Sequence, residues 1–248
     1  MIPFSAEQIL YEDNHLFIIN KACSQLSQSD KSGDPPLGDS IKAFIKRRDH
    51  KPGNVFCNPA HRLDRPSSGI FIFAKTSKAL SRMNRIFRDA QAQKFYWALV
   101  DAPPPEPQGT LRHYLLKDNQ RNKSRAFNEP GRGRREAVLS YTVTYRLENY
   151  FLLEIELHTG RHHQIRAQLA KINIHIRGDL KYGARRSNPD GGISLHARKM
   201  CLRHPVSNQK LTIVADPRRA QADTLWNHLP TSCLYARSAT FFSASFLL

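Results

Sequence analysis

The chain has 248 residues, 40% of them hydrophobic and 9% aromatic, which is enough apolar material for a folded core and excludes wholesale disorder. Thirty-eight lysines and arginines against 21 aspartates and glutamates give a formal net charge of +17. Such a surplus is rarely needed by an enzyme of small metabolites, whereas a polyanion-binding protein gains affinity from every phosphate that it neutralises. We therefore expect a nucleic acid as the partner. An acidic membrane surface is the alternative, but no basic amphipathic anchor helix is evident.

Cysteine usage and the N-terminal sequence bear on the compartment. Four cysteines lie far apart in the chain, at Cys23, Cys57, Cys201 and Cys233, which favours reduced thiols. Residues 1–17 carry acidic side chains and have neither a basic region nor an apolar run, so we expect no signal peptide. No apolar stretch approaches the ~18 residues of a membrane-spanning helix. These features predict a soluble, cytoplasmic protein.

The first hundred residues predict strands separated by two helices. Apolar runs predict strands at residues 15–20, 70–73 and 94–100, and the last run, apolar on both faces, is expected at the centre of a sheet. Asp39 or Ser40 is expected to cap the first helix, and Thr76 or Ser77 the second. Apolar side chains recur at helical spacing, at Ile41, Phe44 and Ile45 in the first helix and at Leu80, Met83, Phe87 and Ala90 in the second.

Two groups of basic residues call for an interpretation. Arg82, Arg85 and Arg88 lie off the apolar face of the second helix, and we interpret them as a solvated surface rather than as an RNA contact. After a proline-rich connector, residues 112–135 contain eight basic and two acidic side chains, a net charge of +6. That segment is either a mobile loop or a contact to an RNA backbone, and the charge of the whole chain favours the contact.

The second half of the chain predicts further strands around one helix. Residues 140–147 and 150–158 flank a turn at Glu148 and Asn149, which indicates a hairpin. Ile165, Leu169 and Ile172 form a helical stripe, and residues 195–205 and 210–217 are typical of closing strands. Strands and helices mix without a regular alternation, which favours an α+β fold with a mixed sheet.

Two segments combine residues that suit chemistry. In residues 61–69, HRLDRPSSG, Asp64 lies between Arg62 and Arg65, and a neighbouring cation keeps a carboxylate ionised, as a nucleophile must be. By composition alone, a structural Arg–Asp pair is the commoner explanation. Residues 159–166, TGRHHQIR, lie where a strand turns into a helix, a place where backbone N–H groups, arginine and histidine can meet an anion.

Together these segments resemble the catalytic core of the RluA-type pseudouridine synthases. The family signatures HRLDRxTSG and TGRTHQIR stand here as HRLDRPSSG and TGRHHQIR, and KFYWALV contains the family's K-x-Y at Lys94 and Tyr96. GDLKYG at residues 178–183 and LHARKMCLRHP at residues 195–205 match later landmarks in the expected order. The resemblance covers residues 9–217, and five ordered motifs make it specific.

The resemblance implies a reaction and three catalytic residues. A uridine in RNA would be isomerised to its C-glycoside, with Asp64 as the nucleophile and the ribose C1′ as its favoured target, a logic shared with retaining glycosidases. The base would be extruded into a pocket, where Tyr96 would stack on it. Arg166 would pair with Asp64 and keep it ionised. Which group removes the C5 proton is left open.

The resemblance also implies the fold and the substrate contacts. The expected fold is α+β, a long, mostly antiparallel mixed sheet in two subdomains with the active-site cleft between them. Residues 1–230 would form the catalytic domain, without the S4-like domain that many relatives carry before it, and residues 231–248 would be a tail of unknown role. Either Arg62 or Arg65 would fill the gap left by the flipped base. The residues implied in RNA or substrate contact are His61, Arg62, Arg65, Lys94, Arg161 and Leu195.

Several positions depart from the family pattern. Ser67 replaces the usual threonine and keeps its hydroxyl, His162 replaces a threonine, and Gln168 stands where a histidine often follows. No metal is expected, since His158, His162 and His163 have no thiolate or carboxylate beside them in the sequence. No GxxxxGK loop is present, so no nucleotide cofactor is expected.

The leading hypothesis is therefore a cofactor-independent RNA uridine isomerase that acts as a monomer on ribosomal or transfer RNA. A non-catalytic RNA-binding or ribosome-assembly protein is the first alternative, and the intact Asp64 argues against it. A DNA glycosylase would also need base flipping and positive charge, but no comparable set of motifs supports it.

Overall fold

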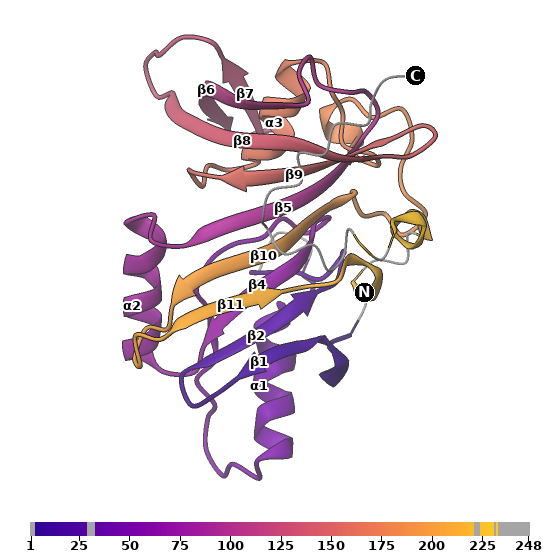
Figure 1. Cartoon of the computed structure of the whole chain (residues 1–248). Coiled ribbons are helices and arrows are strands. Elements are labelled where there is room, and N and C mark those ends of the chain that lie inside the picture. Colours follow the sequence, from indigo (N-terminus) through magenta and orange to yellow (C-terminus); the bar gives the residue numbers. More distant parts are fainter. Residues whose placement is uncertain (1–2, 29–32, 221–223, 231, 233–248) are drawn as a thin grey trace.

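A computed structural model describes residues 3–28, 33–220, 224–230 and 232, and one large sheet runs through it (Figure 1). The strands of this sheet are, in chain order, β1 (Ile9–Glu12), β2 (Leu16–Lys21), β3 (Asn58–Pro59), β4 (Ser68–Ala74), β5 (Gln93–Val100), β6 (Gln108–Asp118), β7 (Lys123–Phe127), β8 (Arg135–Arg146), β9 (Phe151–Leu157), β10 (Leu195–Arg203) and β11 (Lys210–Val214). The helices are α1 (Leu37–Arg48), α2 (Ser77–Arg88) and α3 (Gln164–Lys171). The short helical turns are η1 (Ala6–Gln8), η2 (Leu180–Tyr182), η3 (Pro217–Arg219) and η4 (Thr224–His228).

The sheet is continuous from one end of the molecule to the other. Its order is β1-β2-β4-β10-β5-β9-β8-β6-β7, with β3 paired to β4 and β11 paired to β10. Among the described strands, β10 and β4 form the one parallel pair, and the remaining pairs are antiparallel. The expected α+β fold with a mixed, mostly antiparallel sheet is thus confirmed.

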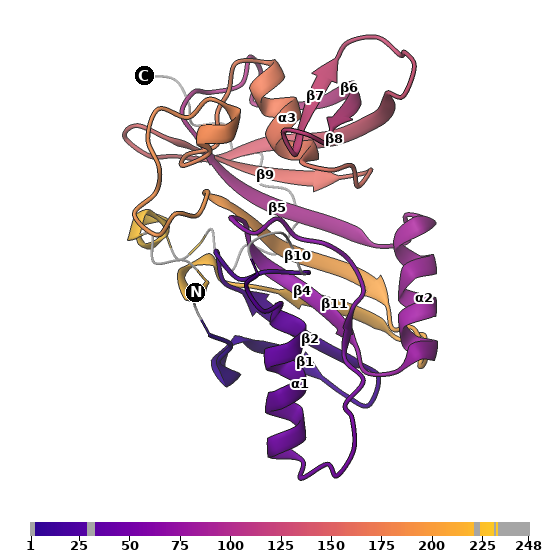
Figure 2. The same ribbon diagram turned by 180° about the vertical axis from the view of Figure 1, so that it is seen from behind.

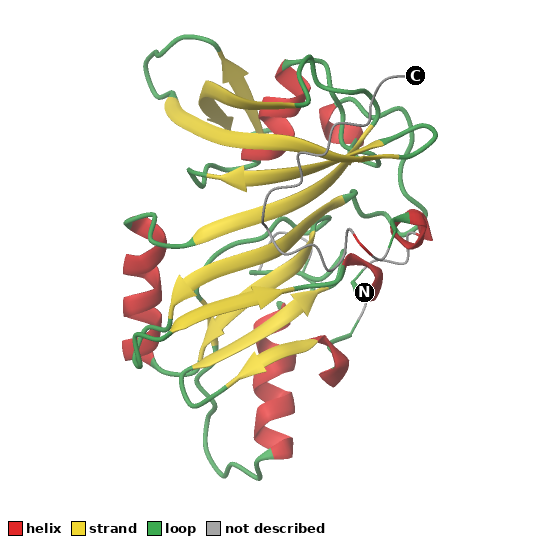
Figure 3. Ribbon diagram, viewed as in Figure 1, coloured by secondary structure: helices red, strands yellow, loops and turns green. Residues whose placement is uncertain are grey.

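Two halves meet at strands β10 and β5. The lower half in Figure 1 contains β1, β2, β4, β10 and β11, with α2 beside the strand ends on the left. Figure 2 shows α1 on the face of this half that is turned away from the viewer in Figure 1. The upper half contains β6 to β9, and α3 packs against β6 and β7. Coloured by secondary structure, the strands form the body of the molecule and the helices lie against it (Figure 3). The expected division into two parts follows from this arrangement.

Burial explains why the apolar runs form the inner strands. Every residue of β2 and β4 is buried, and β5 is buried from Tyr96 to Val100. A second cluster lies on the other side of β5 and β9, where Trp97, Leu99 and Leu152 pack with Trp226 and Leu229. Strand β5 is therefore apolar on both faces because both faces are covered, as its central position requires.

A close approach of two strands fixes the end of the first motif. Gly69 in β4 has a φ of +113°, and a Cβ there would collide with the backbone nitrogen and carbonyl oxygen of Ala197 in β10. Only glycine combines that backbone conformation with that approach. The final glycine of HRLDRPSSG therefore allows β4 and β10 to pair, which anchors the loop before it.

Most of the predicted elements are confirmed, and three details differ. Thr76 caps α2 through its side chain, but α1 begins at Leu37 after Pro36, so neither Asp39 nor Ser40 caps it. Pro36, whose ring fixes its φ angle, precedes the first turn of α1, so the prediction of a polar N-cap at Asp39 or Ser40 was wrong. Ala90 lies beyond α2 and is exposed. The basic residues 112–135 span the strand pair β6–β7 and the start of β8 rather than forming one long loop.

Other expectations concern thiols, membranes and the tail. Cys23, Cys57 and Cys201 are free thiols, and Cys233 lies outside the described residues. No helix within the described ranges is long and apolar enough to cross a bilayer. The expected tail at residues 231–248 falls outside the described residues, apart from residue 232.

Candidate active site

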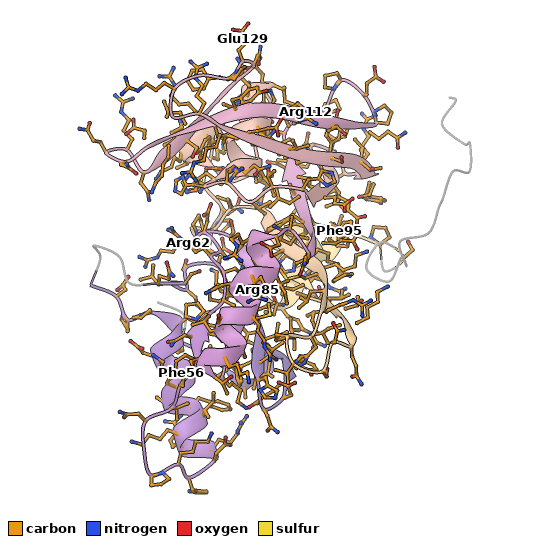
Figure 4. All side chains as sticks on the ribbon, turned by 90° about the vertical axis from the view of Figure 1, so that its left-hand side faces the viewer. Phe56, Arg62, Arg85, Phe95, Arg112 and Glu129 are labelled. Carbon is orange, nitrogen blue, oxygen red and sulfur yellow. The ribbon has the colours of Figure 1, made fainter. Side chains whose placement is uncertain are left out.

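Residues of both sequence motifs line one large cleft between the two halves of the sheet. The cleft has a volume of about 900 Å³ and is lined by residues of the β3–β4 loop, of α2 and β5, and of the segment that leads into α3. Asp64, Tyr96 and Arg166 all line it, although they are far apart in the sequence. Viewed from the side in Figure 4, Arg62 lies between Arg112 above and Arg85 below, at the level where the two halves meet.

The loop that carries Asp64 is anchored from beneath. The ammonium group of Lys21, which is fully buried, donates to the carbonyl oxygens of Ala22, Gln25 and Arg65 at 2.9, 3.0 and 3.2 Å. Burial lowers the pKa of Lys21 to about 7. Ser27 holds the same loop by donating its hydroxyl to the Leu63 carbonyl oxygen at 2.5 Å. The backbone on both sides of Asp64 is therefore fixed by buried or partly buried hydrogen bonds.

Arg166 links Asp64 to a second carboxylate. Its Nη1 donates to Oδ2 of Asp64 at 3.0 Å, while Nε and Nη2 donate to the two oxygens of Asp179 at 2.6 and 2.7 Å. Burial opposes the charge on Arg166, but the hydrogen bonds and charges of Asp179 and Asp64 outweigh it and raise the pKa of the guanidinium. Arg166 therefore stays cationic and stabilises Asp64 as a carboxylate.

His163 contacts Asp64 from another side. Its Nε2 lies 3.5 Å from Oδ2 of Asp64, and its Nδ1 lies 3.0 Å from the hydroxyl of Tyr182. The residue has a φ of +51°, a left-handed conformation that is uncommon outside glycine and asparagine and that occurs often at functional sites. Burial lowers the pKa of the imidazole to about 3, so the ring is neutral at neutral pH. The ring of His162 stacks on it at 3.8 Å.

Tyr96 and Leu195 line the cleft from adjacent strands. Tyr96 on β5 is 8% exposed and Leu195 on β10 is 4% exposed. Burial raises the pKa of Tyr96, so its phenol is un-ionised. Lys94, two residues before Tyr96, also lines the cleft, and burial lowers the pKa of its ammonium group. A planar ring, an aliphatic side chain and a cation therefore border the same cavity as Asp64.

The four other predicted residues lie at the cleft but differ in what holds them. His61 accepts the N–H of Ile72 on Nε2, and burial lowers its pKa to about 4, so it is a neutral part of the wall. Arg65 pairs with Asp34 at 2.7 Å, and Arg161 donates from Nε to the carbonyl oxygen of Glu136. Arg62 is exposed. Within the described part of the chain, its guanidinium has no hydrogen bond or ion pair.

Three contacts of Asp64 and Arg166 were not foreseen from the sequence. Asp179 and Tyr182 belong to GDLKYG, which served only as a landmark, and His163 was considered as a contact to an anion or as a metal ligand, not as a partner of Asp64. Their positions in family motifs indicated a functional role, but their partners depend on the tertiary fold.

Gln168, fully buried, donates its amide to the carbonyl oxygens of Leu111 and Ala137 and so holds α3 to the sheet.

His158, His162 and His163, in and just before the second motif, have separate partners. His158 bonds to Ser140, His162 to Asn122 and Ser124, and His163 to Tyr182. Across the described residues, no group of three or more histidine, cysteine, aspartate and glutamate side chains is placed to hold a metal ion.

Comparison with known proteins decides the family. Residues 15–171 match the family model described as RNA pseudouridylate synthase. The chain belongs to that family. An RluA described as a dual-specificity RNA pseudouridine synthase, from Haemophilus influenzae, is 31% identical over 84% of this chain and 91% of its own. An uncharacterised RNA pseudouridine synthase of Synechocystis is 32% identical over 84% of this chain, which spans 64% of that relative's length.

A solved structure supports the fold of this pseudouridylate synthase. The human RNA pseudouridylate synthase domain containing 4 superposes with a TM-score of 0.69 and 23% identity, covering 84% of this chain and 88% of the human chain. The range matched by the family model includes Asp64, Tyr96 and Arg166 but ends before Asp179 and Tyr182. In this family member, the carboxyl group of Asp64, held by the Arg166 guanidinium, borders a cavity with an aromatic wall.

Proposed function

We propose that this protein isomerises a specific uridine in structured RNA to pseudouridine, with Asp64 as the nucleophile. The observation that carries the proposal is the position of Asp64. Its side chain is 28% exposed in the cleft, while Arg166 holds it from the protein side. A nucleophile needs this combination of an ionised form and an open path to the substrate.

The reaction balances without a cofactor. Asp64 attacks C1′ of the ribose, and the N1–C1′ bond breaks with its electron pair leaving on the uracil. The uracil turns within the cleft, C5 bonds to C1′, and the carboxylate of Asp64 is released. One proton leaves C5 and one is gained at N1, so the product is an isomer of the substrate. Neither a metal nor a nucleotide is required by this scheme.

The base must leave its stack to reach Asp64. Tyr96 would stack on the extruded uracil, with Leu195 and His61 shaping the wall and Lys94 adding positive charge. We assign Arg62 rather than Arg65 to the gap left in the RNA, because Arg62 is exposed at the mouth of the cleft whereas Arg65 is paired with Asp34. An arginine already held by a carboxylate would have to break that pair first.

The RNA backbone would lie over the basic surface of the upper half. Arg161 at the cleft and the arginines of residues 112–135 belong to this surface. The ring of Phe127 packs under the guanidinium groups of Arg134 and Arg125, at 3.7 and 5.8 Å, which orders these cations without neutralising them. Charges fixed in this way suit phosphate contacts.

Residues 1–230 would form a single catalytic domain that acts as a cytoplasmic monomer, and no role is assigned to residues 231–248. Ribosomal RNA and transfer RNA are both candidate substrates.

Mapping of pseudouridine in total RNA tests the function directly. RNA from cells with and without the gene should differ by at least one site. That site should return with the wild-type protein but not with Asp64→Asn. If the two RNA samples carry the same sites, and the purified protein also fails to modify transcripts in vitro, the function is a non-catalytic one.

A further inference from the structure

The side of Asp64 that faces the protein has a specific hydrogen-bond arrangement. Arg166 Nη1 and His163 Nε2 both approach the same oxygen, Oδ2, at 3.0 and 3.5 Å. Among the described residues, Oδ1 has no hydrogen-bond partner. The two oxygens of this carboxylate therefore have different surroundings. Whether His163 adds a second hydrogen bond to Oδ2 depends on which ring nitrogen carries the proton.

The hydrogen bonds of Tyr182 limit where that proton can lie. A phenol oxygen has one hydrogen to donate and two lone pairs to accept with. The backbone N–H of Ser124 donates to it at 2.8 Å and occupies one lone pair. Its hydrogen can then go either to Nδ1 of His163, at 3.0 Å, or to the carbonyl oxygen of Ser124, at 3.2 Å.

Each choice fixes a tautomer of His163. If Tyr182 donates to Ser124, Nδ1 of His163 must carry the proton in order to bond to Tyr182, and the lone pair of Nε2 then faces the carboxylate of Asp64. If Tyr182 donates to Nδ1, the proton lies on Nε2 and points toward Oδ2. A lone pair against an anion is repulsive, whereas an N–H against an anion is attractive, so the ionised Asp64 selects the second arrangement.

We propose that Tyr182 fixes His163 as the neutral Nε2–H tautomer, and that His163 and Arg166 both donate to Oδ2 of Asp64, which leaves Oδ1 as the attacking oxygen. His163 and Tyr182 are positioning residues in this scheme. The role of Oδ1 rests on the proposed function of Asp64, whereas the tautomer does not.

The same short turn supports both donors. Asp179, just before η2, binds Arg166, and Tyr182, at the end of η2, binds His163. The guanidinium of Arg166 also lies 4.9 Å from the centre of the Tyr182 ring. A shift of this turn would move both donors together, so the turn sets the orientation of the Asp64 carboxylate.

The tautomer can be measured without substrate. In the full-length protein labelled with ¹⁵N-histidine, the His163 ring should show a protonated Nε2 and an unprotonated Nδ1, with His163→Asn providing the assignment. In Tyr182→Phe the Nδ1–H tautomer should gain population, because the hydrogen bond from Tyr182 to Nδ1 is gone and the carboxylate of Asp64 alone then favours Nε2–H. A wild-type ring protonated on Nδ1 overturns the proposal. So does a ring unchanged by Tyr182→Phe.

Two substitutions of His163 separate its hydrogen bond to Tyr182 from its contact with Asp64. His163→Asn tolerates the left-handed backbone and keeps a polar atom near Nδ1, but it cannot reach Asp64. His163→Gln places its amide nitrogen near the position of Nε2 and can still donate to Asp64. In single-turnover reactions at saturating RNA, we expect the rate to fall about tenfold in His163→Asn and in Tyr182→Phe, and less in His163→Gln.

The RNA dissociation constant should be unchanged in all three variants. Tyr141→Phe, a buried tyrosine on β8 whose hydroxyl bonds to the backbone at Glu106, is the matched control and should keep the wild-type rate. Equal rates in His163→Asn and His163→Gln contradict the positioning role. A wild-type protein that forms no pseudouridine contradicts the proposed function instead, and the ¹⁵N spectrum then still tests the tautomer.

Discussion

Asp179 and Arg166 form a buried ion pair with two parallel hydrogen bonds. Nε and Nη2 of the arginine donate to the two carboxylate oxygens at 2.6 and 2.7 Å. The side chain of Asp179 is 1% exposed and that of Arg166 is 5% exposed. This geometry fixes the guanidinium plane, so that the remaining donor, Nη1, points at Asp64. The pair thus connects the interior of the upper half to the carboxylate in the cleft.

Removing the charge of Asp179 should therefore cost both stability and turnover. Asp179→Asn leaves a buried guanidinium with one fewer anion, and the free energy of unfolding should fall by about 3–5 kcal/mol. Urea denaturation measures this decrease. Asp39→Asn is the control, because Asp39 is 60% exposed and its pair with Lys42 should contribute less than about 1 kcal/mol. Equal decreases in the two variants would contradict a special role for the buried pair.

Asp64→Asn should abolish pseudouridine formation and leave RNA affinity largely intact. The amide has nearly the same shape as the carboxylate but cannot act as the nucleophile. A tritium-release or mass-spectrometric assay measures turnover, and a filter-binding assay measures the dissociation constant. Asp101→Asn, which alters an exposed pair with His175, should keep full activity. Turnover near the wild-type level in Asp64→Asn would remove Asp64 from its proposed role.

Tyr96 should contribute through its ring rather than through its hydroxyl. Tyr96→Ala removes the stacking surface and should lower kcat/KM by an amount equivalent to about 1–3 kcal/mol. Tyr96→Phe keeps the ring and should retain most of the activity. An unchanged rate in the alanine variant would assign Tyr96 to the core alone.

The basic surface of the upper half should determine the salt dependence of RNA binding. Replacing Arg132, Arg134 and Arg135 by glutamine should make the plot of log Kd against log salt shallower, by about 0.7–0.9 for each phosphate that is no longer neutralised. A matched variant that neutralises Lys46, Arg47 and Lys51, which are exposed at the far end of α1 and in the turn after it, should leave the slope unchanged. The same slope in both variants would show that residues 132–135 do not contact RNA.

His196 should make the fold sensitive to acid. It is fully buried between Ser68 and the carbonyl oxygen of Ala215, and burial lowers its pKa to about 3, below the unfolded value of about 6.5. Between these two values the unfolded chain binds a proton that the folded chain does not, so stability falls as the pH decreases through this window.

Urea titrations at several pH values test this effect. Between about pH 6.5 and about pH 4, the free energy of unfolding should depend less steeply on pH in His196→Gln than in the wild type, by up to about 1.4 kcal/mol per pH unit. Above about pH 7.5 the two slopes should coincide, because the histidine is then neutral in both states. Parallel curves throughout would mean that His196 takes up its proton as readily in the folded protein as in the unfolded chain.

The sequence was most informative where local patterns and burial coincide. The apolar runs of β2, β4 and β5 and the hairpin β8–β9 could be predicted because buried strands leave a short-range pattern. Asp64 and Arg166, 102 positions apart, were brought together by the family motifs rather than by any pattern of their own.

What could not be predicted depends on tertiary contacts. The role of Tyr182 rests on a backbone N–H from β7, and the ion pair that occupies Arg65 comes from a loop residue, Asp34. The start of α1 was missed because Pro36, not a polar side chain, precedes its first turn.

The unbroken sheet also determines whether the protein or the RNA must change shape when the two bind. Strands β10 and β5 are paired along six positions at the junction of the two halves, so a hinge there would have to break a ladder of buried hydrogen bonds. A rigid frame of this kind cannot close around a stacked base. The deformation then falls on the RNA, and uridines in loops, bulges or weak helices, which unstack at little cost, should be the ones that the enzyme modifies fastest.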